Sequence, residues 1–580
     1  MTEKCKKLII AAAAFVLGAV VGGTSVYIAK KDADGGQTVS QTKTTAMVSA
    51  ADYAAVYKKI KDFKPGIWEN INSWVDGYTT NNGAKSGSTS FAEESAASDD
   101  YSETNVQVEG VDEADTVKTD GKFIYILKSN YDESEKIIKT EIKTVDIRNG
   151  EPTQLKSISI DGFKTYDMYL SDGRITVIGT EDIEKDSFKA VIYDISDPAS
   201  PKKIQECTQS GVYSESRLIG GKLYIISNFC IDTENIKKAQ PETYVPALDC
   251  KNYNGTVNPD SICFYNSCSN PEYTVLSAYD IKDGSLVSTR SVLGGTCTVY
   301  ASTENIITSS YPTDGKIQIT RFSATDGKIE LAASGELNGE LLNQFSVDEY
   351  KEHFRFVLTD RNGEYMKNSL VILDKDLKKT GAITDIAEDE QVYSVRFMGD
   401  TVYFVTFRQV DPLFSADVSD PTAPKITGSL KIPGFSNYLF PFGDGKLFGI
   451  GQNADEKTGR TTGMKISMFD ISDPANVTEC AKTDLNAPYS EALSNHKATL
   501  ADSKKNLIGF PAYGGSNNTV YYIFSFEDGK FVKKAEADLP YINSGCRGLY
   551  ANGDFYIAAP DKIYYSPLEK LDSFKSLELK

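Results

Sequence analysis

The chain has 580 residues, with 62 Lys and Arg against 81 Asp and Glu, so its formal net charge is −19. This acidity excludes nucleic acid as a partner and excludes a polybasic membrane-binding surface. Hydrophobic residues make up 40% and aromatic residues 11% of the chain, which is enough apolar material for at least one large core. Tyr and Phe are abundant and there are only 2 His, so the composition favours β-sheet and leaves little for a His-rich metal site.

The N-terminus carries an uncharged apolar run. Residues 8–29 are long enough, at about 1.5 Å per residue, to cross the roughly 30 Å hydrocarbon core of a bilayer. Lys4, Lys6 and Lys7 precede the run and favour a cytoplasmic location for residues 1–7. We therefore expect a single-pass signal anchor in the cell membrane, with the lipid bilayer as a partner and the bulk of the chain extracytoplasmic. The alternative is secretion after cleavage of this segment.

Three segments are expected to lead from the anchor to the main domain. Residues 30–48 are polar and predict a linker, and residues 79–103 lack apolar periodicity and predict a second, flexible linker. Between them, residues 49–78 predict a short amphipathic helical segment that contains both Trp of the chain and packs on the main domain or on the membrane surface. Its apolar side chains recur at helical spacing at Tyr53, Val56, Tyr57 and Ile60.

From about residue 104 onward the chain repeats itself. One mark of the repeat is a tight turn followed by an alternating apolar strand, as in Asp120-Gly121 before KFIYIL and Asp172-Gly173 before RITVIG. The other mark is a strand that ends in an Asp-containing turn, as in TVDIRNG, IYDISDP and MFDISDP. We interpret these Asp residues as turn chemistry, because Asp side chains accept hydrogen bonds from the backbone of their own turn.

The second mark recurs along the whole domain. Its aligned positions are Asp146, Asp194, Asp280, Ser323, Asp374, Asp417, Asp470, Ser525 and Ser566. Neighbouring positions lie 41 to 55 residues apart, except for one interval of 86 that contains a Cys-rich insertion at about residues 230–272. No helix-length amphipathic segment interrupts the series, so residues 104–580 are expected to form an all-β domain, a β-propeller of eight or nine four-stranded blades. Eight blades result if the C-terminal unit, from Gly553 onward, pairs with N-terminal strands at about 106–117.

Particular segments of this domain resemble a known family. They are TNVQVEGVDEADTVKTDGKFIYIL at residues 104–127, the spaced DISDP turns and the later NHKATL. Together they resemble secreted bacterial and archaeal proteins with a C-terminal β-propeller domain distantly related to WD40 repeats, over about residues 104–570. The resemblance implies an exported propeller. It implies no particular chemistry, because that family is known mainly as a fold of uncharacterised function.

Eight cysteines lie in the part expected outside the cytoplasm, and an even number in an oxidising compartment predicts disulfides. They are Cys207, Cys230, Cys250, Cys263, Cys268, Cys297, Cys480 and Cys546. Half of them fall in the Cys-rich insertion, where two bridges would staple a long loop. The alternative is a four-thiolate zinc site, which needs paired short spacings, and no CxxC motif occurs in the chain.

An acidic cluster is the first candidate site. Its carboxylates fall within seven residues, at Glu109, Asp112, Glu113 and Asp115. Clustered carboxylates can hold a hard cation through oxygen ligands, so Ca²⁺ is the candidate ligand, and no other cofactor is expected. The alternative interpretation is structural, with these residues at turns near the closure of the ring and one carboxylate lining the pore.

The second candidate site is His496 beside Lys497, in SEALSNHKATLADSKKN. These residues would serve as a general base or bind an anionic group if a partner carboxylate lay nearby in space. The alternative is a His that hydrogen-bonds the backbone at the end of a strand.

The motif search favours a protein without catalytic activity. No G-x-S-x-G, HExxH, P-loop or dinucleotide-binding motif occurs in the chain. We expect a membrane-anchored extracytoplasmic β-propeller that acts as a binding or scaffolding module for an extracellular protein, peptide or cell-wall glycan. One alternative is an extracellular hydrolase or lyase with a carboxylate site in the propeller channel, and another is a purely structural surface protein.

Overall fold

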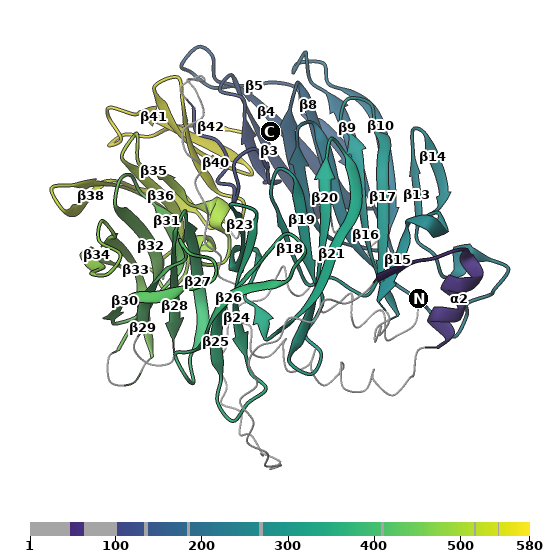
Figure 1. The fold of residues 1–580 in the computed structure, drawn as a ribbon. Helices are drawn as coiled ribbons and strands as arrows, with labels where there is room; N and C mark the ends of the chain where they lie inside the picture. The colour runs from purple at the N-terminus through teal and green to yellow at the C-terminus, as the bar shows by residue number, and fades with distance from the viewer. Residues whose placement is uncertain are drawn as a thin grey trace.

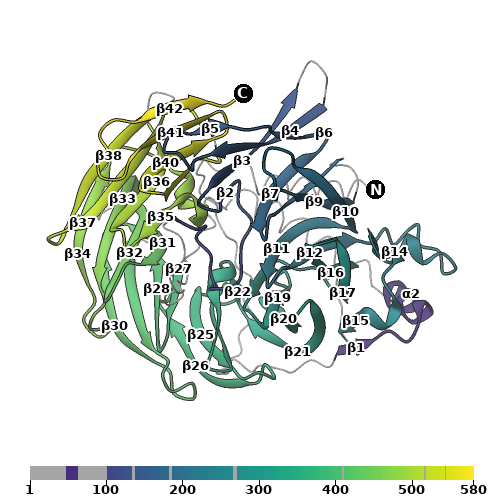
Figure 2. The same ribbon diagram turned by 90° about the horizontal axis from the view of Figure 1, so that it is seen from above.

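The computed structural model describes residues 47–62 and 101–580, except for 133–136, 182–185, 266–270, 408–410, 456–457, 459, 515–517 and 543. The predicted anchor at residues 8–29, both Trp and most of the two predicted linkers lie outside the described residues. In the part that is described, no helix is long and apolar enough to cross a bilayer. Nine antiparallel sheets follow one another along the chain and surround a common axis, as Figure 1 and Figure 2 show from two directions.

Blades 2 and 3 differ from the others because additional strands extend their outer edges, and blade 1 has a divided outer strand. Blade 1 consists of β2 (Val117–Thr119), β3 (Phe123–Asp132), β4 (Ile137–Asp146), β5 (Thr153–Gln154) and β6 (Ile158–Asp161). Blade 2 consists of β7 (Lys164–Ser171), β8 (Arg174–Thr180), β9 (Ser187–Asp194) and β10 (Lys202–Ser210). Blade 3 consists of β11 (Val212–Ile219), β12 (Lys222–Cys230), β16 (Glu272–Asp280) and β17 (Ser285–Leu293).

Blades 4 to 6 continue the same order from the inner to the outer strand. Blade 4 consists of β18 (Thr298–Ala301), β19 (Asn305–Ser309), β20 (Lys316–Thr325) and β21 (Lys328–Asn338). Blade 5 has a divided inner strand, β22 (Glu340–Leu341) and β23 (Val347–Tyr350), followed by β24 (His353–Asp360), β25 (Lys367–Leu373) and β26 (Lys379–Ile386). Blade 6 consists of β27 (Gln391–Met398), β28 (Thr401–Phe407), β29 (Asp411–Asp417) and β30 (Lys425–Ile432).

The last three blades bring the chain back to blade 1. Blade 7 consists of β31 (Phe435–Pro441), β32 (Lys446–Ala454), β33 (Thr461–Asp470) and β34 (Thr478–Leu485). Blade 8 consists of β35 (Leu500–Asp502), β36 (Leu507–Tyr513), β37 (Asn518–Glu527) and β38 (Lys530–Pro540). Blade 9 consists of β39 (Arg547–Ala551), β40 (Asp554–Ala559), β41 (Lys562–Pro567) and β42 (Lys575–Glu578).

Both marks of the sequence repeat coincide with fixed points of the blade. The nine aligned Asp and Ser positions lie within two residues of the end of the third strand, one in each blade. At the DISDP turns the Asp side chain accepts from the backbone two residues ahead, as in Asp470 with Ser472 N at 3.0 Å. The tight turn of blade 2 has positive φ at both Asp172 and Gly173, which is the geometry of a type I′ hairpin turn. The prediction of an all-β propeller of eight or nine blades is therefore confirmed, and the number of blades is nine.

Apolar clusters between neighbouring blades hold the ring together. Within the described residues there are nine such clusters, one for each pair of adjacent blades, including the pair formed by blades 9 and 1. The cluster between blades 7 and 8, for example, contains the buried rings of Phe440, Phe448 and Phe510. Each sheet thus buries both of its faces, which a four-stranded sheet alone cannot do.

Side-chain contacts close the ring, and no strand of the described residues is shared between blades 9 and 1. Just before the channel segment, the backbone N–H of Ser102 also donates to Tyr550 O on the inner strand of blade 9 at 2.9 Å. The seam cluster joins Ile124 and Ile126 of blade 1 to Ile563 and Leu579 of blade 9. At its outer edge Lys143 Nζ donates to the backbone oxygen of Leu579 at 3.1 Å. The eight-blade alternative is therefore wrong, because the C-terminal unit completes a blade of its own and does not pair with strands at about 106–117.

The Cys-rich insertion builds a platform on the outer edges of blades 2 and 3. Its strands β13 (Ala247–Cys250) and β14 (Tyr253–Thr256) extend blade 2, and β15 (Ile262–Tyr265) extends blade 3 by pairing parallel with β17. Two short 3₁₀ turns, η2 (Pro241–Thr243) and η3 (Pro259–Ser261), connect these strands. We call residues 231–265 the platform.

The N-terminal arm docks on this platform. It consists of β1 (Met47–Ser49), which pairs antiparallel with β15, and α2 (Tyr53–Lys61), which begins after the N-cap Asp52. Val56 and Ile60 of α2 are buried against the platform residues Tyr244, Val245 and Leu248. Figure 1 and Figure 2 both show α2 beside β13–β15 on the outside of the ring.

Among the described residues, the structure contains none of the disulfides expected from the sequence. Free thiols are found at Cys207, Cys250, Cys263, Cys480 and Cys546. The Sγ of Cys230 lies 3.6 Å from Glu272 Oε1, the backbone N–H of Cys297 donates to Ser309 O, and Cys268 lies outside the described residues. Strand pairing and the apolar cluster beneath α2 hold the platform instead, so its order does not require a bridge within the loop.

Candidate functional site

The segment that precedes blade 1 crosses the middle of the ring. We call residues 104–116 the channel segment. Asp112 exchanges two backbone hydrogen bonds with Leu218 on the inner strand of blade 3, at 2.9 and 3.0 Å. Asp115 exchanges two with Met168 on the inner strand of blade 2, at 3.0 and 3.1 Å. The channel segment therefore adds bridges to the inner strands that face the axis.

The other half of the channel segment reaches the opposite blades. The Nδ2 of Asn105 donates to Thr499 O next to blade 8. The Nε2 of Gln107 donates to Gln344 O at 3.0 Å and to Val347 O at 3.1 Å in blade 5. Gly110 makes the turn between the two halves with φ of +74°, a conformation that disfavours other residues. The segment thus spans the channel from blade 8 to blade 2.

A second insertion enters the channel from the loop between blades 7 and 8. It forms two 3₁₀ turns, η5 (Glu491–Leu493) and η6 (His496–Ala498). Ser490 and Asn495 cap these turns by accepting from the backbone of Ala492 at 2.9 Å and Lys497 at 3.2 Å. The caps fix Glu491, His496 and Lys497 against the channel segment.

Glu113 is the centre of the first charged contact. Its carboxylate lies 3.2 Å from His496 Nε2 and accepts from Gln107 N at 3.0 Å and Gln344 Nε2 at 3.1 Å. Burial raises the pKa of this carboxyl, but the charges of Arg217 and His496 outweigh burial and hold the pKa well below its usual range. The partner carboxylate required for His496 therefore exists, and the pair is enclosed, with the Phe345 ring 5.0 Å from the imidazole.

Asp115 forms the second charged contact. The guanidinium of Arg547, on the inner strand of blade 9, lies between two carboxylates, with Nη2 2.9 Å from Asp115 Oδ1 and Nη1 2.9 Å from Glu491 Oε1. The side chains of Arg547 and Asp115 are only 6% and 3% exposed. Burial raises the pKa of Asp115, and the neighbouring charges of Arg547 and Lys497 reverse the effect and lower it. The three residues form a buried ionic bridge from blade 9 to the channel segment.

The remaining members of the acidic cluster point elsewhere. Asp112 Oδ1 lies 2.7 Å from Lys118 Nζ, which also donates to Glu113 O at 2.6 Å. Glu109 is exposed and lines a pocket on the ring face. Within the described residues no group of three or more His, Cys, Asp or Glu side chains is arranged to hold a metal ion. Lys118 and Arg547 already pair with Asp112 and Asp115, and the Glu113 carboxylate contacts Gln107, Gln344 and His496. As they are placed, these three carboxylates therefore do not fit a Ca²⁺ site.

Lys497 connects the channel segment to a carboxyl on blade 2 whose pKa is raised. Its Nζ donates to Ala114 O at 2.5 Å and lies 3.7 Å from Asp167 Oδ2 on blade 2. Burial, helped by the charges of Asp115 and Glu215 and opposed by that of Lys497, raises the pKa of Asp167 to about 6. Glu215 in turn pairs with Arg217, with Oε1 2.8 Å from Nη1. Asp167 is thus the channel carboxyl that takes up a proton near neutral pH.

Sequence reasoning missed five members of this network. They are Asp167, Glu215, Arg217, Glu491 and Arg547. A signal was available for three of them, because Asp167, Glu215 and Arg547 occupy the same register, four residues before the end of an inner strand. The marks of the repeat lie on the second and third strands, so the repeat provides no alignment of the inner strands.

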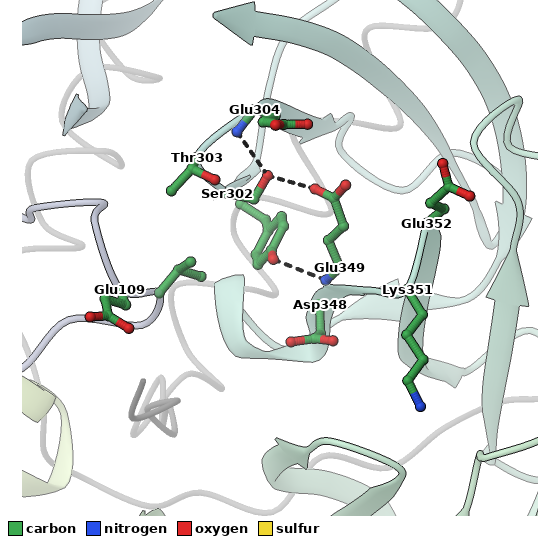
Figure 3. Close-up of a pocket in the computed structure, with 10 residues that line it drawn as sticks. Glu109, Ser302, Thr303, Glu304, Asp348, Glu349, Lys351 and Glu352 are labelled. Carbon is green, nitrogen blue, oxygen red and sulfur yellow. Dashed lines mark hydrogen bonds between the residues drawn. The ribbon is translucent and has the colours of Figure 1, made fainter. Parts of the chain in front are cut away.

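Two cavities remain open beside the network. One, of about 500 Å³, lies between the channel segment and the inner strands and is lined by Asp112, Lys118, Lys497 and Arg547 among others. The other, of about 440 Å³, lies on the ring face between blades 4 and 5, where Figure 3 shows five carboxylates around it. They belong to Glu109, Glu304, Asp348, Glu349 and Glu352. We call this cavity the ring-face pocket.

The ring-face pocket is preformed by hydrogen bonds. Glu349 accepts from Ser302 Oγ at 2.5 Å and from Asn305 Nδ2 at 2.8 Å, as Figure 3 shows in part. Asp348 accepts from Arg355 Nε at 3.0 Å. The one cation at its rim, Lys351, is turned toward Asp400, 2.9 Å away on blade 6. The pocket is therefore a rigid and strongly acidic surface.

Fold and channel together define a nine-bladed β-propeller whose channel is filled by its own N-terminal segment. The chain belongs to the family described as "Beta propeller domain", whose model matches residues 101–571. An uncharacterised protein of Methanocaldococcus jannaschii is 29% identical over 80% of this chain and 82% of that protein. An uncharacterised protein of Archaeoglobus fulgidus is 28% identical over 96% of this chain and 97% of that protein. The β-propeller domain of the Trilobed protease of Pyrococcus furiosus is 14% identical, covers 65% of this chain and 100% of that chain, and has a TM-score of 0.31.

Removal of the central guanidinium should destabilise the ring. The variant Arg547→Met leaves Asp115 and Glu491 as buried, unpaired carboxylates, and we expect the free energy of unfolding to fall by about 3–5 kcal/mol. Denaturant titration measures this change. The control Arg361→Met removes an exposed ion pair with Glu340 and should cost less than about 1 kcal/mol. Adding Asp115→Asn and Glu491→Gln to Arg547→Met should recover part of the loss, and equal stability of Arg547→Met and the parent protein would contradict the assignment.

Asp167 should make stability depend on pH in an unusual direction. Because its folded pKa of about 6 lies above the unfolded value of 3.8, stability from this group is full below about pH 4 and is lost as pH rises through 6. Asp167→Asn should therefore be more stable than the parent protein at pH 7.5, by up to about 3 kcal/mol, and no more stable at pH 4. Thermal unfolding at several pH values tests this. The control Asp470→Asn removes a carboxyl whose pKa is lowered to about 2, so it should be destabilising at neutral pH.

Proposed function

We propose that this protein is an exported, membrane-anchored β-propeller that binds a protein, a peptide or a cell-wall glycan through the face of its ring. The apolar run at residues 8–29, preceded by Lys4, Lys6 and Lys7, supports the anchor and the orientation. The docking of the N-terminal arm on the platform supports a short connection between anchor and ring, because α2 lies against the outer edges of blades 2 and 3.

The main support for a binding role is that the protein's own side chains occupy the channel. Glu113 and Asp115 face His496 and Arg547 at hydrogen-bond distance and are almost fully buried. A glycosidase or lyase needs carboxylates that reach the substrate with one of them protonated, whereas Glu113 and Asp115 both have a lowered pKa and are held by protein partners. These two buried contacts therefore suit the closure of the ring and support binding over hydrolysis.

The surface that we propose for the ligand is the ring-face pocket. The ring-face pocket draws on the channel segment, on blade 4 and on blade 5, so its walls do not move independently. The carboxylates of Glu109, Glu304 and Glu352 form no ion pair with a described residue. They disfavour anionic ligands and are free to accept hydrogen bonds from the hydroxyl or amine groups of a glycan or a peptide.

Binding can be tested with the full chain in detergent against a panel of peptidoglycan fragments, neutral polysaccharides and synthetic peptides. We expect saturable binding of at least one member without release of product. The double variant Glu109→Gln and Glu304→Gln should weaken that binding by about tenfold or more, because charge-assisted hydrogen bonds are lost. The matched control Glu330→Gln changes an exposed carboxylate on β21, outside the pocket, and should bind as the parent does. Product release that Asp112→Asn abolishes would establish the hydrolase or lyase alternative.

Topology can be tested on intact cells with an amine reagent that does not cross membranes. The propeller lysines Lys378 and Lys425 are 62% and 68% exposed and should be modified without lysis. Lys4, Lys6 and Lys7 should be modified only after lysis, because they precede the anchor. Peptide mapping by mass spectrometry reads both sets from the same sample. Modification of the propeller lysines only after lysis would contradict the proposed orientation.

A further inference from the structure

Two thiols lie opposite each other where the platform joins blade 2. Strand β13 of the platform pairs antiparallel with β10, the outer strand of blade 2, through Gln209 with Leu248 and Thr208 with Asp249. The next step of this register sets Cys207 opposite Cys250, and both residues belong to the strands. Directly opposed residues of an antiparallel pair have Cα atoms about 4.5–5.5 Å apart, within the range that a disulfide spans.

The two side chains also share a face of the sheet. Cys207 and Cys250 are 2% and 8% exposed and belong to the same apolar cluster between blades 2 and 3. Each thiol makes only a weak contact elsewhere, Cys207 with Gly284 O at 3.3 Å and Cys250 with Asn252 Oδ1 at 3.5 Å. Neither contact would have to be kept if the two sulfur atoms turned toward each other.

We propose that Cys207 and Cys250 form a cross-strand dithiol that is oxidised to a disulfide, covalently tying the platform to blade 2. The oxidant is another disulfide, either a small molecule or a thiol oxidoreductase. One cysteine thiolate attacks it and forms a mixed disulfide, and the second cysteine then displaces the other thiol. The protein loses two protons and two electrons, which reduce the oxidant to two thiols.

Burial decides when this bond forms. The apolar surroundings raise the pKa of the Cys207 thiol well above its usual range, so very little thiolate is present in the folded protein. Exchange therefore proceeds while the platform hairpin β13–β14 is undocked, during folding or local opening. Once formed, the bond keeps this hairpin on blade 2 and so maintains the surface on which α2 docks.

This pairing differs from bridges within the insertion and has a different consequence. A bridge inside the insertion would shape the loop alone, whereas the bond from Cys207 to Cys250 links the loop to the ring. Since Val56 and Ile60 of the N-terminal arm pack on the same loop, the bond lies on the mechanical path from the anchor to the propeller. The inference concerns the purified chain and does not depend on which ligand the ring face binds.

The test uses the full chain, purified in detergent with its thiols reduced. The protein is incubated with oxidised glutathione, quenched with acid, denatured, alkylated and digested without reduction. We expect one linked peptide pair that contains Cys207 and Cys250 and lacks the mass of two hydrogen atoms. We also expect slower protease cleavage within the β13–β14 hairpin than in the reduced protein.

Matched variants separate this pair from the other cysteines. Cys207→Ser should abolish the linked pair, leave Cys250 alkylated and remove the difference in cleavage rate. Cys546→Ser alters another buried thiol, between blades 8 and 9, and should change none of these results. Alkylation of both Cys207 and Cys250 after oxidation, a link from either to a different cysteine, or stable glutathione adducts on either would overturn the proposal. The peptide mapping of the parent protein is decisive by itself, so the test remains valid even if a variant fails to fold.

Discussion

The structure depends on the fact that a four-stranded sheet with two apolar faces cannot exist alone in water. Each blade of this protein covers both faces only because it has a neighbour on either side, and nine apolar clusters fill the nine spaces between blades. The constraint leaves no free sheet face at the first and last blades, so the ring must close. It closes through Ile126, Ile563 and other side chains at the seam, and without a strand shared across it.

Because no strand is shared across the seam, contacts along the axis of the ring must help to hold the blades together. The channel segment supplies the missing connection, since it is bonded to blades 2, 3, 5 and 8 before it becomes the inner strand of blade 1. It brings carboxylates into a place from which water is largely excluded, and a buried carboxylate is tolerated only beside a cation with good geometry. Arg547 meets that requirement for Asp115, whereas the Glu113 carboxylate is held by contacts with His496, Gln107 and Gln344. The two stretches behind the family resemblance, residues 104–127 and NHKATL, therefore meet in space for a physical reason.

On the outside of the ring, the insertion and the N-terminal arm likewise bury their apolar side chains only by packing against neighbouring elements. The platform has too few residues for a core of its own, and it buries Tyr244 and Leu248 only by joining the edges of blades 2 and 3 and accepting α2. The cost of a long loop between blades is thus offset by a new surface that positions the arm. A link between Cys207 and Cys250 would act where this surface meets blade 2, beside the short β10–β13 pairing.

The sequence by itself determined the architecture, because turn chemistry and alternating strands are local and recur with every blade. Asp146 through Ser566 mark the third strand of all nine blades, and a period near 50 residues admits little besides a propeller. Only the tertiary structure decided the blade count and the roles of the candidate residues. Whether Glu113 binds a cation or His496 depends on a residue about 380 positions away in the chain, and no local pattern records such a contact. The register shared by Asp167, Glu215 and Arg547 becomes meaningful only when the ring brings their strands around one axis.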